Sequence, residues 1–99
     1  MKVGHNAEAS ARIYRRHASI SFTRLAGQGL LVIPEGAQQV VLNEQGLRVL
    51  ELLDGQRRVD ELARLLADEY DAEPAEVIQD VLDLLEDLRS RGAVLGPQD

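Results

Sequence analysis

The stretch LVIPEGAQQVVLNEQGLRVLELLDG, residues 31–55, decides the fold, because it predicts a strand, a turn, a second strand and a helix in succession. The apolar run at residues 30–33 stops at Pro34, which lacks the N–H that a ladder hydrogen bond needs. Gly36 completes the bend, and residues 39–42 form a second strand. The segment therefore predicts two antiparallel strands joined by a short connection.

A helix should begin directly after these strands. Asn43 is a favoured N-cap residue, and Glu44 places negative charge in the first helical turn. Leucines at helical spacing continue to about Leu53. Asp54-Gly55 then offers a residue that tolerates the left-handed conformation in which helices commonly end.

A further strand precedes the quoted stretch. Within residues 18–25, Ile20 and Phe22 share one face at the period of two that is typical of strands. The turn to the next strand comes from Ala26-Gly27-Gln28-Gly29. Because the connections are short, the most economical arrangement is an antiparallel meander of three strands.

Two more helices are predicted downstream. One covers residues 59–70, and the other begins at Pro74, a residue suited to the first helical position, and runs to about Arg91. Gly92 ends that helix, and residues 93–95 can add a short extended segment. The sequence thus predicts an α+β fold, with a three-stranded antiparallel sheet followed by three helices.

The last of these helices is more apolar than one core requires. At about 100° per residue, its apolar side chains cover an arc of roughly 160°, whereas a surface helix needs roughly 100° to cover one core. One edge of this helix therefore has apolar surface to spare.

Length and composition limit the class of protein. Ninety-nine residues fit one domain, which we place at residues 18–95, between a flexible N-terminal arm at 1–17 and a C-terminal tail at 96–99. The chain has no cysteine, and no apolar run approaches the roughly 18 residues of a membrane span. No apolar stretch of a signal peptide follows the charged N-terminus, so we expect a cytoplasmic protein that does not enter a membrane.

The charged residues argue against several functions. Residues 44–99 hold six arginines and fifteen carboxylates, which should repel nucleic acid. His5 and His17 lie too far apart for paired metal ligands, and the serines have no plausible histidine partner in a fixed element. We therefore expect no catalytic residues, no metal and no cofactor.

The order of the elements resembles the PqqD family, small peptide-binding domains that are also called RiPP recognition elements. The resemblance covers residues 18–95. The motifs that carry it are Leu42-Asn43, Leu53-Asp54-Gly55, and a last helix in which Asp80-Val81 is followed by Leu84, Leu85, Leu88 and Gly92. Each motif is weak alone, but their order and spacing together make the match fairly strong.

The resemblance implies a non-catalytic adaptor of winged-helix-like fold. Members of this family hold the leader segment of a ribosomally made precursor peptide and present it to a modifying enzyme, which is a radical SAM protein in the pyrroloquinoline quinone (PQQ) pathway. The leader adds as a strand beside the third strand, in a groove closed by the third helix. In this chain the receiving backbone would be Gln39, Val40, Val41 and Leu42, and the groove wall would come from Ile78, Leu82 and Leu85.

Physical reasoning supports the same docking mode and leaves alternatives open. The outer strand of a meander has unpaired N–H and C=O groups that an extended peptide can satisfy. The same edge could instead pair with a second copy of the chain, giving a structural homodimer. A DNA-binding winged helix shares the fold, but its candidate recognition helix, residues 59–70, carries one arginine among four carboxylates.

Overall fold

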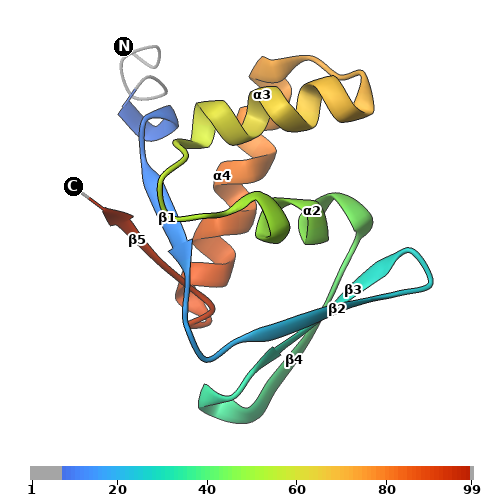
Figure 1. Cartoon of the computed structure of the whole chain (residues 1–99). Helices are drawn as coiled ribbons and strands as arrows, with labels where there is room; N and C mark the ends of the chain where they lie inside the picture. The colour runs from blue at the N-terminus through green and yellow to red at the C-terminus, as the bar shows by residue number, and fades with distance from the viewer. Residues whose placement is uncertain (1–7, 99) are drawn as a thin grey trace.

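Two antiparallel sheets and three longer helices make up the computed structural model, which describes residues 8–98 (Figure 1). The strands are β1 (Ile13–Arg16), β2 (Ser21–Leu25), β3 (Gln28–Ile33), β4 (Gln38–Leu42) and β5 (Val94–Gln98). The helices are α2 (Glu44–Leu52), α3 (Val59–Tyr70) and α4 (Pro74–Ser90), and a 3-10 turn, η1 (Glu35–Ala37), joins β3 to β4. The predicted α+β fold, a three-stranded sheet followed by three helices, is confirmed.

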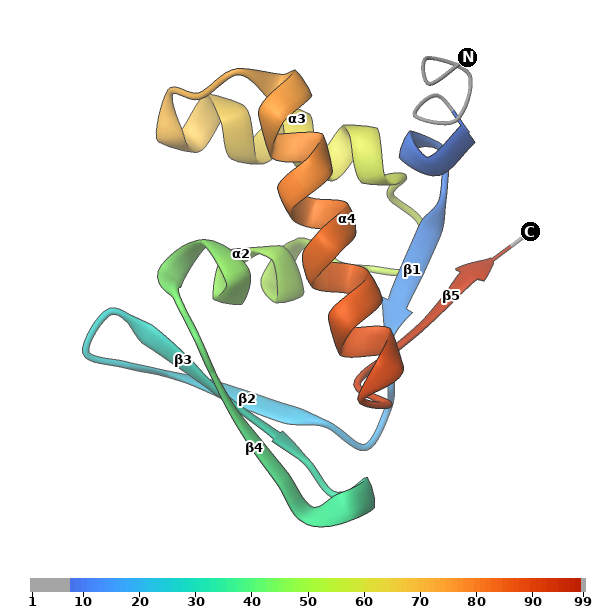
Figure 2. The ribbon, with the colours of Figure 1, turned by 180° about the vertical axis from the view of Figure 1, so that it is seen from behind.

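The three-stranded sheet has the order β2-β3-β4 and projects below α2 (Figure 2). A two-residue turn joins β2 to β3, with φ of 50° at Ala26 and 79° at Gly27. Positive φ at both positions defines a type I′ hairpin, whose twist matches that of the flanking strands. Between β3 and β4 the chain bends at Gly36, where φ is again 79°.

Local hydrogen bonds fix where the helices begin. The Asn43 side chain accepts a hydrogen bond from the Gly46 N–H at 2.7 Å, as expected for an N-cap. At the start of α3, the Glu61 carboxylate accepts from the backbone N–H of Arg58 at 2.9 Å. The N-terminus of α2 is therefore fixed directly after β4. The N-terminus of α3 is fixed directly after the loop that follows α2.

One core lies between the helices and the inner face of the three-stranded sheet. Its fully buried large side chains come from both sheets and all three longer helices: Tyr14, Leu31, Ile33, Leu47, Leu50, Leu53, Val59, Leu62, Val81, Leu85, Leu88 and Val94. Phe22 and Ile20 pack against this core while remaining half-buried.

The pairing of β1 with β5 corrects part of the predicted domain division. Residues 13–16, predicted to lie in the flexible arm, pair with β5, and residues 96–98 of the predicted tail belong to β5. Tyr14 is fully buried, and its hydroxyl donates a hydrogen bond to Glu86 on α4 at 2.5 Å. A four-residue strand with one core side chain is too short to show a period in the sequence. Residues 1–7 of the predicted arm lie outside the described residues.

Candidate functional site

β4 is an edge strand with one open side. Its inner side pairs with β3 in the register Gly29↔Leu42 to Ile33↔Gln38, and within residues 8–98 no strand pairs with its outer side. Such an edge presents backbone N–H and C=O groups to any extended chain that approaches it. All of the predicted receiving backbone, Gln39 to Leu42, lies in this strand.

The turn between β2 and β3 determines which backbone groups of β4 face outward. In a two-residue hairpin the residues that flank the turn, here Leu25 and Gln28, form a hydrogen-bonded pair, and bonded pairs alternate from there. The even-numbered residues of β3 are therefore directed to β2, and its odd-numbered residues are directed to β4. In the β3–β4 register, the odd-numbered residues of β3 lie opposite the even-numbered residues of β4, and these form the hydrogen-bonded pairs between the two strands. The N–H and C=O groups of Gln39 and Val41 are left directed outward.

The side chains of β4 alternate between core and surface. Leu42 is 6% exposed and Val40 is half-buried against the core, whereas Val41 is 65% exposed. An exposed valine on an open edge strand contributes little to the core of this chain. The side chains of Val40 and Leu42 therefore pack toward the core of this chain.

A groove of about 430 Å³ lies where β4 leads into α2. Its walls are mostly apolar and come from the end of β4, the first turns of α2, the end of α3 and one face of α4. The residues that line it are Val41, Leu42, Asn43, Gln45, Gly46, Val49, Leu66, Tyr70, Ala72, Glu76, Val77, Asp80, Val81 and Leu84. The open strand edge and the groove thus meet at Val41 and Leu42.

α4 presents a different row of side chains to the groove from the one predicted. Leu85 is fully buried and Leu82 is 7% exposed, so both belong to the core, and Ile78 is half-buried against that core. None of these three lines the groove. The α4 side of the groove is instead formed by Val77, Val81 and Leu84, together with two carboxylates.

Packing of one edge of α4 into the core accounts for this difference, and the β1–β5 pair contacts the same edge. Ile78, Leu82 and Glu86 are spaced four residues apart and so form one row on α4. Tyr14 of β1 donates its hydrogen bond to Glu86, so the β1–β5 side contacts this row at Glu86. The spare apolar surface predicted for α4 exists, but it lies on the opposite edge of the arc.

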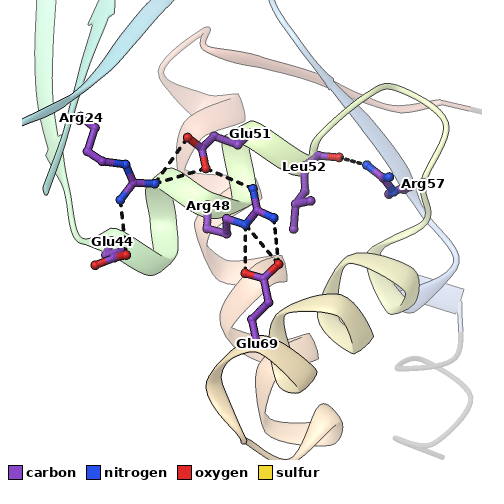
Figure 3. Close-up of polar contacts among 7 residues, drawn as sticks. All are labelled: Arg24, Glu44, Arg48, Glu51, Leu52, Arg57 and Glu69. Carbon is purple, nitrogen blue, oxygen red and sulfur yellow. Dashed lines mark hydrogen bonds and ion pairs between the residues drawn. The ribbon is translucent and has the colours of Figure 1, made fainter. Parts of the chain in front are cut away.

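Arginines beside the groove connect the sheet and the helices (Figure 3). Arg24 of β2 pairs with Glu44 and with Glu51, each at 3.3 Å, and Arg48 of α2 binds Glu69 of α3 at 2.8 Å. The hydrogen bonds from Arg48 lower the pKa of the Glu69 carboxyl below its usual value. These pairs are partly exposed, so each adds little stability. The pairs of Arg24 link β2 to α2, and the pair of Arg48 with Glu69 links α2 to α3.

The described residues offer no metal site and no membrane-spanning helix. Across residues 8–98, no three His, Cys, Asp or Glu side chains gather where they could bind a metal ion. In the same part of the chain, no helix is long and apolar enough to cross a bilayer. The groove residues provide apolar contact, backbone hydrogen bonds and two carboxylates.

Comparison with known proteins identifies the class and then the family. The fold is that of a RiPP recognition element. It matches the solution structure of the PqqD part of Methylobacterium extorquens PqqCD, described as a functional, stand-alone element of this class, with a TM-score of 0.75 and 25% identity over 90% of this chain and 99% of that one. The family model for coenzyme PQQ synthesis protein D (PqqD) matches residues 28–94. The chain belongs to the PqqD family.

Two further relatives are informative. A PqqA binding protein of Rhodopseudomonas palustris strain TIE-1 is 31% identical over 86 residues, which cover 87% of this chain and 82% of the relative. TbiB1, solved in complex with the TbiA(beta) leader peptide, shares the fold with a TM-score of 0.75 at 20% identity, over 86% of this chain and 99% of that one.

Proposed function

We propose that this protein is a non-catalytic adaptor that binds the leader segment of a ribosomally made precursor peptide of the PqqA type. The leader adds as a strand to the outer side of β4, and its side chains enter the groove between β4, α2 and α4. The observation that carries this proposal is the pair of outward-directed backbone positions, Gln39 and Val41, beside an apolar groove. The similarity to a PqqA binding protein and to TbiB1, solved with a leader peptide, supports the same conclusion.

The partner enzyme would be the one that modifies the peptide. For a precursor of the PQQ pathway this is a radical SAM protein, and the complex would form in the cytoplasm, where the precursor is made. An adaptor of this kind raises the local concentration of the substrate at the enzyme without performing chemistry itself.

Substitution of Val41 by proline tests the docking mode. Proline removes the outward N–H of Val41 but leaves the β3–β4 ladder intact, because that ladder uses the even-numbered positions of β4. We expect affinity for the PqqA peptide of Rhodopseudomonas palustris, measured by isothermal titration calorimetry, to fall about tenfold or more. The reason is that the peptide loses one hydrogen bond and can no longer approach β4 closely at this position.

Two variants control this experiment. Val41→Thr keeps the N–H and the branched shape and should bind almost as wild type does. Val40→Pro removes a donor of the internal ladder and should lower the stability measured by urea unfolding.

Equal affinity of wild type and Val41→Pro would contradict strand addition at β4. A wild-type dimer in light scattering that dissociates in Val41→Pro, without peptide binding, would favour the structural homodimer.

A further inference from the structure

The groove contains only one kind of formal charge. Glu76 and Asp80 of α4 are the charged side chains among its lining residues, and no lysine or arginine from residues 8–98 lines it. Both carboxylates are exposed, and they lie four residues apart, one helical turn, on the same side of α4. The groove is therefore apolar in its depth and negative along α4.

Neither carboxylate has a partner among the described residues. The next acidic residues on α4 do have one, since Asp83 accepts a hydrogen bond from Gln79 at 2.9 Å and Asp87 pairs with Arg91 at 3.1 Å. Within residues 8–98, Glu76 and Asp80 form no side-chain hydrogen bond or ion pair. Like charges at this spacing weaken a helix slightly.

The arginines beside the groove are engaged elsewhere. Arg24 is held by Glu44 and Glu51, and Arg48 by Glu69, all on the α2–α3 side of the groove (Figure 3). Neutralisation of the α4 carboxylates by Arg24 or Arg48 would require these pairs to break.

A helix-stabilising role explains only one of the two groups. Glu76 lies in the first turn of α4, where negative charge interacts favourably with the helix dipole. Asp80 lies one turn further on, where this effect has largely decayed. Asp80 lines the groove with Val77, Val81 and Leu84, which favours a role in binding the ligand of the groove.

We propose that the groove selects extended peptides that combine aliphatic side chains, at alternate positions, with a lysine or arginine that reaches Glu76 and Asp80. This inference rests on the proposed function and specifies the chemistry of the peptide. The aliphatic side chains contact Val77, Val81 and Leu84, while the cation replaces the missing partner of the two carboxylates. Because exposed ion pairs contribute modestly, the cation should improve affinity about three- to tenfold at low salt.

Selection from a phage-displayed library of random dodecapeptides tests the inference. Three proteins serve as targets: wild type, Glu76→Gln/Asp80→Asn, and the control Glu8→Gln/Asp68→Asn. The control makes the same change in net charge at two exposed carboxylates that do not line the groove. We expect wild type and control to enrich peptides with aliphatic alternation and a lysine or arginine, and the groove variant to keep the alternation but lose the cation.

Titration of one selected peptide completes the test. Changing its cation to glutamine should weaken binding to wild type about three- to tenfold and leave binding to Glu76→Gln/Asp80→Asn unchanged. Against Glu76→Lys/Asp80→Lys, the peptide with glutamate in place of the cation should bind more tightly than the original.

The possible failures are distinguishable. Selected peptides that compete with PqqA but show no enrichment of lysine or arginine would overturn this inference while leaving strand addition intact. The same enrichment in all three proteins would also overturn it, because the cation would then bind elsewhere. If wild type selects no peptide and does not bind PqqA, the proposed function fails and the inference fails with it.

Discussion

Gly29 in β3 marks the closest approach of the three-stranded sheet to α2. A Cβ atom built at this position would lie 2.9 Å from the Cβ of Leu47, a distance that real Cβ atoms essentially never show. Because the Cβ of Leu47 cannot rotate away, any side chain at residue 29 forces the sheet and the helix apart. The small residue at this point therefore sets how α2 lies on the sheet, and with it the position of the adjacent groove.

This close contact makes Gly29→Ala a direct test of the packing. We expect the substitution to lower the free energy of unfolding by about 1–3 kcal/mol, the usual cost of overpacking a core. Urea unfolding followed by circular dichroism measures it, with Gln28→Ala, an exposed position of the same strand, as the control. Equal stability of the two variants would mean that the sheet and α2 do not lie this close.

At the scale of single elements, α4 has two functional sides. One side, with Leu82 and Leu85, is buried in the core, and the other, with Val77 and Leu84, lines the groove. Adjacent leucines on this helix therefore contribute to different properties, one to the stability of the fold and the other to peptide binding.

A matched pair of alanine substitutions separates these two sides. Leu85→Ala should cost about 2–5 kcal/mol of stability, as for other fully buried leucines. Leu84→Ala should cost about 1 kcal/mol, because the side chain is only half-buried, but should weaken binding of the PqqA peptide severalfold. Thermal unfolding and titration calorimetry measure the two effects, and weaker binding by a still folded Leu85→Ala than by Leu84→Ala would reverse our assignment of the sides.

Most elements of this fold could be predicted from the sequence because their ends carry local signals. Ala26-Gly27, Pro34, Asn43 and Pro74 each mark a turn or a helix start by their own backbone chemistry, and the structure places boundaries at each. β1 could not be predicted, because its stability comes from β5, at the far end of the chain.

The candidate site could be predicted only in part, for a related reason. The open edge of β4 follows from the order of local hairpins, which the sequence indicates. The groove face of α4 depends on which side of the helix is already buried in the core, and that is set by tertiary packing, including a β1–β5 pair that was not predicted. The wide apolar arc correctly indicates a spare face, but only the tertiary structure shows that this face carries Val77, Val81 and Leu84.

For the whole molecule, acid should be destabilising. Hydrogen bonds from Arg89 and Tyr14 lower the pKa of Glu86, those from Arg48 lower that of Glu69, and the backbone N–H groups of Gln56 and Arg57 lower that of Asp54. A carboxyl whose pKa is lowered by folding contributes stability that is fully present above its unfolded pKa. That contribution is lost as pH falls through the folded pKa.

The pH dependence can be measured by urea unfolding between pH 7 and pH 3. We expect stability to be nearly constant down to about pH 5 and to decline below about pH 4, where unfolded carboxyls bind protons more readily than the three folded ones. In Glu86→Gln the side chain cannot titrate, so the free energy of unfolding should decline less as pH falls. A rise in stability between pH 5 and pH 3 would contradict the assignment of these three groups.

The β1–β5 pair also brings the two ends of the folded unit together, with Ile13 opposite Gln98 in an antiparallel ladder. A domain whose first and last strands lie side by side can be inserted into a surface loop of a larger protein, or fused to either end of one, without disrupting its core. This geometry allows the fold to occur as a domain within a larger protein. A circularly permuted form, with a short linker across the ladder and new ends in an exposed loop, should retain the native arrangement.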